Sequence, residues 1–482
     1  MEITGRVVSI LLLFAVYFCP EELYGQDHEI FAGVAQVDIT PPDDYFHYRG
    51  IGTGVHDPLY AKAIVWGRGD QRFSLVVCDL LWIERELSTQ IRSLVSQEIQ
   101  IPSSRIIVAG THSHTGPAYH LNMQELNSAL RPASSIPPTT SEGISYPEWL
   151  AKSIARAVIE ADKASTQVNI HAGVVSVDNL AFNRRFILTD GTVRFNAGVG
   201  NPAIVKAAGP VDTEMGIIWI TRASDNKPLG CISSFGLHAD TFGGTEFSAD
   251  YPGFLARALR TDFGEDFVSI FGAGACGDIN HVDVKGGKRL SSAEIGDKLA
   301  VAIKDEVADL QKFDHAVLDS DAEFVYAPLQ HFSDEELAWA LPESQDSLYK
   351  ESAFLTRRRA VKIRSLHRMQ STGEAIPPTI GKGPWTIPLE VQVFRIGDDV
   401  AIVGLPGEIF TELSMAIKKA SPFKTTLVVE LTNSHIAYVP TEKAFRQGSY
   451  ETINSRVAPG GGELMVEAAI NLLTMMKSDE AQ

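Results

Sequence analysis

Uninterrupted apolar runs recur through the first half of the chain. Each is short and bounded by polar or glycine-rich segments, which is typical of strands buried on both faces. The predicted strands are Phe73 to Trp82, Arg105 to Gly110, Asn169 to Val177, Met215 to Thr221, Gly230 to Gly236 and Phe267 to Gly272. Apolar residues at a 3.6-residue period predict helices over Glu84 to Glu98, Pro147 to Ala164 and Ser291 to Lys312.

The second half begins with a more polar stretch, Asp314 to Lys382, which we interpret as a solvated helical excursion with a basic run around Arg357 to Arg364. The elements predicted after it are a hairpin of Leu389 to Ile396 and Val400 to Leu405, a helix that Pro406-Gly407-Glu408 opens and Ala420 ends, a strand over Thr425 to Leu431 and a helix over Glu463 to Lys477. Strands and helices alternate throughout. The pattern predicts an α/β fold: one large domain over residues 26–482, with mixed sheets flanked by helices.

Composition changes this picture little but excludes some partners. The chain has 482 residues, of which 44% are apolar and 21% charged, and its net charge is −18. These values are ordinary for a globular protein, and the negative charge argues against binding nucleic acid or an anionic membrane surface. No internal repeat is visible.

The first 25 residues resemble a secretory signal peptide. Arg6 precedes an apolar run from Val7 to Phe18, which is too short to span a bilayer, and cleavage is predicted near Gly25. A lipid anchor on Cys19 is the weaker alternative because bulky residues precede it. We therefore expect a secreted or periplasmic protein with no transmembrane segment. The three cysteines that remain form no disulfide framework, and Cys78 and Cys231 are predicted to be buried thiols.

A pair of histidines gives the first sign of chemistry. His112 and His114 follow the apolar strand that ends at Gly110, and Gly116-Pro117 follows them. Imidazole is a common metal ligand and an acid or base near neutral pH. A strand-end pair of this kind indicates either a metal or catalytic site, or two structural histidines.

Other candidates are weaker when taken singly. His238 also follows a strand, where it could be a buried structural residue, and Glu408 could simply complement the dipole of the helix predicted to begin there. Tyr438 and Tyr450 lie in a predicted loop, where tyrosines usually serve packing. Residues 277–281 form a turn after a strand, which could approach a ligand through its backbone. No nucleophile elbow, Walker A loop or HExxH motif is present.

Taken together, short motifs along the chain resemble those of the neutral (alkaline, non-lysosomal) ceramidase family. They occur in the family's order over roughly residues 30–455. The matching segments are residues 32–41, 54–63 and 110–117, Asn183-Arg184, Gly277-Asp278, Leu405-Pro406-Gly407-Glu408, and Tyr438 with Tyr450-Glu451 twelve positions later. Residues 110–117, GTHSHTGP, resemble the family's GTHTHSGP signature.

The resemblance implies a zinc site and a reaction. The implied zinc ligands are His112, His238, Glu408 and Tyr438. His114 and Tyr450 are implied to be catalytic, with His114 moving a proton to the leaving nitrogen. Arg184 is implied to bind substrate and, with Tyr450, to stabilise the oxyanion.

Two departures from the family pattern matter. The family's GDVSPN serine aligns with Asn280, which cannot form an acyl-enzyme, so zinc-activated water must attack directly and Asn280 is expected to bind substrate. The family's C-terminal immunoglobulin-like domain is expected to be absent. The loop Arg131 to Gly143 is predicted to lie near His112, and whether it closes over the site is left open.

The sequence therefore favours a secreted zinc amidohydrolase that cleaves the N-acyl bond of a ceramide-like lipid. Two alternatives stay open: a zinc hydrolase or deacylase acting on exported glycans, and a binding relative without catalysis. The first reading predicts a long apolar groove beside the zinc, whereas the glycan reading predicts a polar pocket lined by aromatic residues. The oligomeric state is not predicted.

Overall fold

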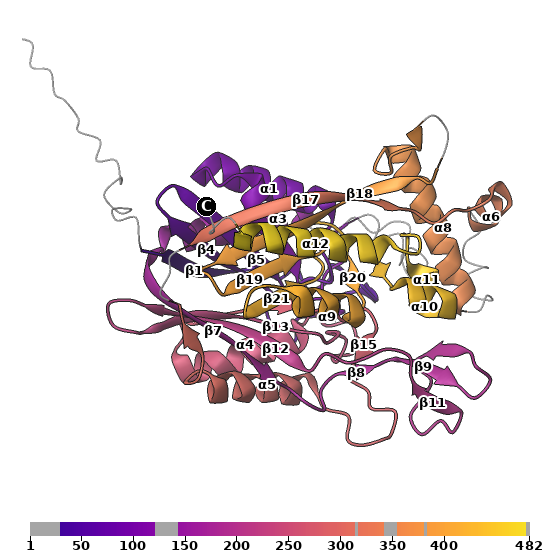
Figure 1. The fold of residues 1–482 in the computed structure, drawn as a ribbon, viewed down its shortest axis with the longest axis horizontal. Coiled ribbons are helices and arrows are strands. Elements are labelled where there is room, and N and C mark those ends of the chain that lie inside the picture. Colours follow the sequence, from indigo (N-terminus) through magenta and orange to yellow (C-terminus); the bar gives the residue numbers. More distant parts are fainter. Residues whose placement is uncertain (1–28, 121–142, 314–316, 342–353, 380–382, 479–482) are drawn as a thin grey trace, which may run out of the picture.

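The computed structural model describes residues 29–120, 143–313, 317–341, 354–379 and 383–478. Two large sheets lie face to face, and helices cover their outer faces (Figure 1). The mixed α/β architecture predicted from the sequence is confirmed. The predicted signal segment, Cys19 and residues 131–142 of the predicted loop lie outside the described residues.

The larger sheet is mixed and nine-stranded in the described part of the chain. Its order is β14-β13-β12-β7-β1-β4-β5-β6, with β16 added beside β7. The bounds are β1 Phe31–Asp38, β4 Tyr60–Arg68, β5 Gln71–Cys78, β6 Ile106–Gly110, β7 Thr166–Ser176, β12 Glu214–Arg222, β13 Pro228–Phe235, β14 Val268–Ala273 and β16 Gln311–Lys312. In this order β6 and β14 are the two edge strands, and each pairs in parallel with its neighbour, β6 with β5 and β14 with β13.

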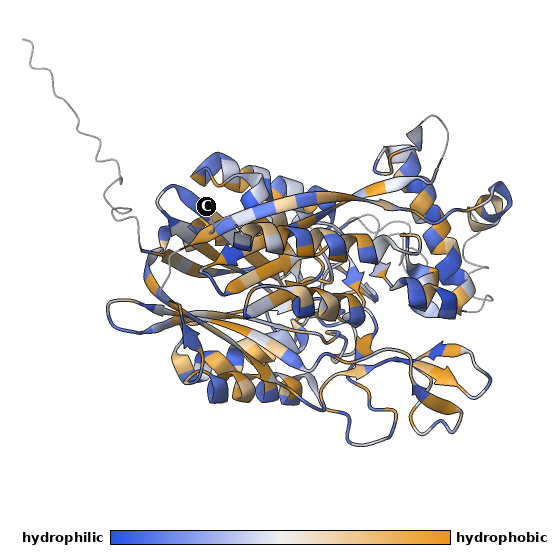
Figure 2. Ribbon diagram, viewed as in Figure 1, coloured by the Kyte–Doolittle hydropathy of each residue, from blue (hydrophilic) through white to orange (hydrophobic). Residues whose placement is uncertain are grey.

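The second sheet has the order β17-β18-β19-β21, and its last pair is parallel. Its strands are β17 Leu318–Pro328, β18 Thr386–Ile396, β19 Val400–Gly404 and β21 Thr425–Val429. Apolar side chains of both sheets, such as Trp66 and Ile270 from the first and Phe394 and Ile402 from the second, form one buried core between them. This layer explains why the predicted strands read as continuous apolar runs, and both sheets are largely hydrophobic in Figure 2.

Helices cover the outer faces in three groups. On the larger sheet, α1 (Arg85–Ile99) and α3 (Tyr146–Lys163) cover one half, and α4 (Asp250–Phe263) and α5 (Ser292–Glu306) cover the other. The second sheet is covered by α9 (Thr411–Ala420) and α12 (Gly461–Ser478). Each helix buries one apolar face, as the 3.6-residue period predicts.

Two predicted elements end or begin elsewhere. The helix predicted over Ser291 to Lys312 ends at Glu306, because Gln311–Lys312 pairs with β7 as a strand. The helix predicted to open at Pro406 begins only at Thr411, and Glu408–Ile409 forms the short strand β20. Glu408 is therefore not at a helix N-terminus, and the dipole explanation for it is wrong.

The polar stretch after Asp314 contains the long strand β17, α6 (Asp334–Ala340) and α8 (Phe354–Thr372). The prediction of helices that pass over the core is confirmed, since Leu366 and Met369 of α8 pack into the core. The helix α8 is less solvated than predicted, because Ala360 and Ile363 are also buried and several of its arginines line cavities.

Short elements gather at one end of the molecule, at the right of Figure 1. They are β8 Phe182–Asn183 with β15 Ile279–Asn280, β20 Glu408–Ile409 with β22 Tyr438–Val439, the sheet of β9 Arg185–Leu188, β10 Val193–Phe195 and β11 Ile204–Ala207, and helices α10 Glu442–Gln447 and α11 Tyr450–Asn454. The remaining described elements are β2 Phe46–His47, β3 Gly50–Ile51 and the 3₁₀ turn Ser103–Arg105.

Cys78, Cys231 and Cys276 are free and buried, as predicted for the first two. Among the described helices, none combines the length and apolar character needed to cross a bilayer.

Candidate active site

His112 lies in the loop that leaves the carboxyl end of β6. Its φ is 68°, in the left-handed region that non-glycine residues seldom adopt, and its side chain is fully buried. The ring Nδ1 lies 2.9 Å from the carbonyl oxygen of Leu81. Because a carbonyl can only accept, Nδ1 carries the proton and Nε2 presents its lone pair to the interior.

His238 is oriented by the same device from the other half of the large sheet. It follows β13, is buried, and places Nδ1 2.8 Å from the carbonyl oxygen of Cys276. Its Nε2 is therefore also unprotonated. Two strand ends separated by more than a hundred residues thus present two imidazole lone pairs to one point.

Glu408 and Tyr438 enter the site as direct partners in the parallel pair β20–β22. Gly407, with φ of 95°, allows the chain to reach Glu408, since a Cβ there would lie 2.7 Å from the Ile436 side chain. Gly277 allows the β15 turn to pack against it, because its Cβ would lie 2.6 Å from the Glu408 carbonyl oxygen. These contacts explain the glycines in the LPGE and GD segments.

The side chains converge closely. Nε2 of His112 and Nε2 of His238 each lie 3.5 Å from Oε2 of Glu408, and Nε2 of His114 lies 3.4 Å from Nε2 of His112. The three histidines form a cluster whose nitrogens lie within 4.8 Å of one another. Oε2 of Glu408 is buried without a hydrogen-bonding partner. A buried, orphaned carboxylate oxygen facing oriented imidazole lone pairs fits a cation held between them, and nitrogen and oxygen ligands of this kind suit a transition metal such as zinc.

Most of the pKa shifts in the cluster are those expected of residues that bind a metal ion. Burial lowers the pKa of His238 to about 4, with Arg184 contributing, and burial together with the neighbouring His112 lowers the pKa of His114. Burial alone would raise the pKa of Glu408, but His112 and His238 hold it well below its usual value. Burial would lower the pKa of His112, but Glu408 raises it above its usual value. His112 would therefore give up a proton on binding a metal ion, because neutral histidines and an ionised carboxylate are the forms that bind metal.

Arg184 stands behind the cluster. Its Nη1 lies 3.2 Å from Nε2 of His238, Nη2 donates to the Gly277 carbonyl at 2.7 Å, and Nε donates to Glu451 at 3.1 Å. Burial would lower its pKa, but Tyr438 and Glu451 raise it above the ordinary value, so the guanidinium is held charged. Glu451 also accepts from Arg185 at 2.7 Å.

Tyr450 begins α11 and stacks on Phe195 with ring centres 4.4 Å apart. Its ring lies 5.5 Å from that of Tyr438, and burial raises its pKa to about 12. The phenol is thus a protonated donor at neutral pH. It can donate a hydrogen bond to an oxyanion.

One cavity joins most of these groups. Five of the predicted site residues line it, namely His112, His114, Glu408, Tyr438 and Tyr450. The rest of the wall consists of residues that sequence reasoning did not select: Tyr48, Leu81, Trp82, Arg358, Val361, His435, Ala437, Asn454 and Arg456. His238 and Arg184 lie directly behind this wall, in contact with it.

Asn280 is placed differently. It lies on β15, where its Nδ2 donates to Asn196 at 2.9 Å and its Oδ1 accepts from the backbone of Val282 at 2.9 Å. It is not among the residues that line the cavity. Its predicted contact with substrate stays a prediction.

Sequence reasoning missed three groups at the site. His435 stacks on Trp82 at 3.9 Å, with its Nε2 3.9 Å from Glu408. Arg456 lines the cavity, and Glu451 holds Arg184. Only Glu451 had a signal, since it stands beside Tyr450 in the matched tyrosine segment.

Comparison with known proteins bears on this arrangement. Residues 31–288 match the family model described as neutral/alkaline non-lysosomal ceramidase, N-terminal. The chain belongs to this family.

Solved ceramidase structures have the same fold. The neutral ceramidase from Pseudomonas aeruginosa aligns with a TM-score of 0.67 and 17% identity, covering 93% of this chain and 75% of that one. A structure titled as a ceramidase complexed with C2 aligns with a TM-score of 0.67 and 18% identity, covering 93% and 76%. A search of curated proteins finds no match. The ceramidase model covers His112, His114, Arg184, His238 and Asn280, whereas Glu408, Tyr438 and Tyr450 lie beyond it.

Proposed function

We propose that this member of the neutral ceramidase family is a zinc-dependent hydrolase that cleaves the amide bond of an N-acyl lipid of the ceramide class. The observation that carries the proposal is the buried Oε2 of Glu408, orphaned between the oriented Nε2 atoms of His112 and His238. The same three residues and Tyr438 are the ligands that the family resemblance implied.

The four residues His112, His238, Glu408 and Tyr438 would hold the metal. Zinc, when bound, would supply Lewis-acid chemistry and an activated water. Asn280 stands where the family motif has a serine, and its amide is hydrogen-bonded to Asn196. Because asparagine cannot form an acyl-enzyme, the proposed reaction proceeds by direct attack of water.

Residues of the chain would then orient the substrate and protonate its departing nitrogen. Arg184, held by Glu451 and the Gly277 carbonyl, keeps a fixed positive charge behind His238. Tyr450 donates a hydrogen bond to the oxyanion that develops on the acyl carbonyl. His114 lies on the cavity wall, where it would move a proton to the departing nitrogen.

Metal analysis and hydrolysis together test the proposal. Purified protein should contain about one zinc per chain, and the zinc-loaded protein should release fatty acid from a short-chain N-acylsphingosine. Folded protein that binds no zinc, or zinc-loaded protein that cleaves no N-acyl amide, would overturn the proposal. Acetylated sugars in a parallel assay test the glycan alternative. Export stays a prediction, which N-terminal sequencing of the mature protein would test.

A further inference from the structure

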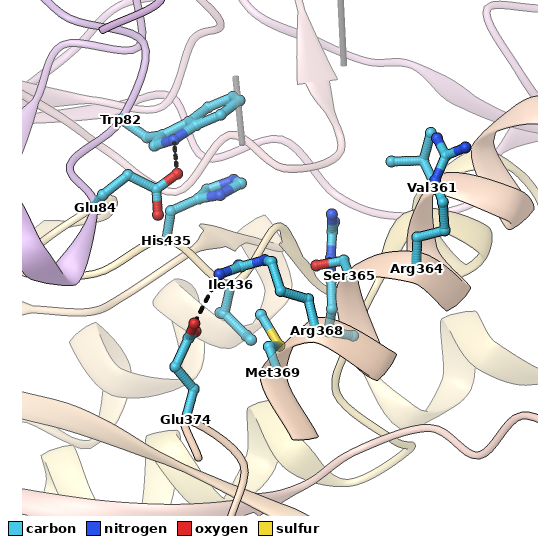
Figure 3. A pocket seen from close by; sticks show the side chains of 11 residues that line it. Trp82, Glu84, Val361, Arg364, Ser365, Arg368, Met369, Glu374, His435 and Ile436 are labelled. Atoms are coloured by element: carbon cyan, nitrogen blue, oxygen red, sulfur yellow. Dashed lines mark hydrogen bonds and ion pairs between the residues drawn. The ribbon is translucent and has the colours of Figure 1, made fainter. Parts of the chain in front are cut away.

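A second chamber adjoins the metal cavity. The two share Trp82, Val361, His435 and Arg456 in their linings, so they lie side by side. The empty space of the second chamber is about 640 Å³, part of it open to solvent. Figure 3 shows the Trp82, Glu84 and His435 side chains on one side and residues of α8 on the other. We name this space the arginine chamber, after Arg364, Arg368 and Arg456.

The described acids of the arginine chamber do not pair with Arg456. They are Glu84 and Glu374. Glu374 is bound to Arg368 at 2.8 Å, and Glu84 accepts from the Trp82 indole at 2.9 Å and lies 3.7 Å from His120. Neither acid lies within ion-pair distance of Arg456, which leaves positive charge beside the metal cavity.

Arg456 is partly buried and differs from the fully buried arginines in its partners. Arg184 and Arg185 share Glu451, and Arg395 has Asp398 at 3.0 Å. Arg456 instead donates to two neutral oxygens, the Asn454 carbonyl at 2.9 Å and the Ser365 hydroxyl at 3.3 Å, and no described carboxylate lies within 4.0 Å of it. Desolvation lowers the pKa of Arg456 to about 10, although the more distant Glu408 and Glu84 act in the opposite direction. The guanidinium therefore stays charged at neutral pH and keeps hydrogen-bonding capacity for an anion.

Arg358 adds a second cation to the metal cavity itself. It lies on the same helix, α8, one turn before Val361, and lines the wall beside Tyr48 and Tyr450. The wall of the cavity therefore contains two guanidinium groups as well as candidate metal ligands. Guanidinium groups bind carboxylates, phosphates and sulfonates through directed, charge-assisted hydrogen bonds.

The two halves of an N-acyl amide fit this cavity differently. An acyl chain is apolar, and placing it among the partly buried guanidinium groups would remove water from them without giving them a hydrogen-bonding partner. Around Tyr450 aromatic rings predominate. The rings of Phe195 and Phe354 both stack on Tyr450, at 4.4 and 5.6 Å between ring centres, and the one guanidinium beside it, that of Arg358, lies over the Phe354 ring at 5.3 Å. The acyl half suits the aromatic side, and the amine half suits the arginine chamber.

We propose that the amine half of the substrate carries an acidic group, which Arg456 binds in the arginine chamber while the amide lies at the histidine cluster. This inference rests on the proposed function and narrows its substrate to acidic N-acyl amides. Neutral N-acylsphingosine would then be a poorer substrate than an acidic relative.

Matched substrates test the inference. N-hexanoylglycine and its neutral amide, N-hexanoylglycinamide, differ in one charge, and phosphonate and sulfonate analogues distinguish the kinds of acid. The wild-type zinc-loaded protein should cleave the best acidic substrate with a kcat/KM roughly tenfold or more above that of the neutral one, because hydrogen bonds to charged groups are strong. Equal rates on both would overturn the inference.

Variants separate binding from structure. Arg456→Gln should lower kcat/KM for the acidic substrate roughly tenfold more than kcat/KM for the neutral one, and Arg456→Lys should keep part of the acidic preference. Arg359→Gln is the control, since Arg359 is exposed on α8 and paired with Glu336 outside the chamber. An equal fall on both substrates in Arg456→Gln would show a structural role and overturn the inference. If that variant does not fold, Arg456→Lys provides the comparison, since it keeps the charge but should still lose part of the acidic preference.

A binding measurement distinguishes this inference from the proposed function. Calorimetric titration with N-hexanoylglycine, N-hexanoylglycinamide and inorganic phosphate needs no catalysis. If the acidic compounds bind, and if Arg456→Gln weakens their binding roughly tenfold, the result supports acid binding in the arginine chamber even when no amide is cleaved. Cleavage of neutral N-acylsphingosine without any acid binding would confirm the proposed function and overturn the inference.

Discussion

Two parts of the cavity are built by different means. We call them the histidine wall, which is His112 with His238 behind it, and the arginine wall, which is Arg358 and Arg456. His112 and His238 leave strand ends, and backbone carbonyls fix each ring through its Nδ1. The arginines come from α8 and from the loop after α11, and their charged ends reach the cavity along flexible stems. The histidine wall is therefore suited to hold one geometry, whereas the arginine wall is suited to set the charge of what enters.

The strongest test of this contrast removes a histidine. His112→Ala should lose zinc and reduce hydrolysis of every N-acyl substrate, acidic or neutral, to the background rate, because a metal ligand is lost. Zinc content and initial rates measure it. His331→Ala, at an exposed histidine, should change neither. Zinc retained at full stoichiometry with normal rates would rule out His112 as a ligand.

A second variant tests the support behind the histidine wall. Glu451→Ala leaves Arg184 and Arg185 buried without their carboxylate, which should cost about 3–5 kcal/mol in the free energy of unfolding. Urea denaturation measures this loss. The control is Glu442→Ala, whose exposed pair with Arg446 should contribute under about 1 kcal/mol. Similar losses in the two variants would show that Glu451 is not the anchor.

Tyr450 allows a test of chemistry without a change in packing. Tyr450→Phe keeps the stack on Phe195 but removes the donor, so kcat should fall roughly 10²–10³-fold with the stability unchanged. Steady-state kinetics and thermal melts check both parts. Tyr326→Phe, at an exposed tyrosine, is the matched control. A kcat within a few-fold of wild type would remove Tyr450 from the mechanism.

The smallest effect is expected at Asn280. Serine can still accept from the Val282 amide but loses the bond to Asn196, so Asn280→Ser should cost about 1 kcal/mol of stability and alter kcat/KM by less than tenfold. Denaturation and kinetics on neutral N-acylsphingosine measure the two. A large gain in ceramide hydrolysis would instead show that residue 280 reaches the substrate.

The same contrast explains what could be predicted from sequence. Strands buried on both faces carry long apolar runs, and His112 follows such a run within an eight-residue motif, so fold class and histidine wall were predictable. Glu408 was placed on a helix because Pro and Gly often precede one, whereas pairing with Tyr438 decides its true conformation. Arg358 and Arg456 carry no local motif. A basic helix looks solvated until tertiary packing turns one of its faces toward a cavity.

The pairing of Glu408 with Tyr438 has a consequence for how the protein matures. During synthesis, both histidines emerge long before β20, β22 and Arg456, so the ligand set is incomplete until almost the whole chain has been made. The region that the family model matches, residues 31–288, lacks the carboxylate that completes the set. Acquisition of metal should therefore be among the last events of folding, and an interrupted chain would carry the histidine signature without a working centre.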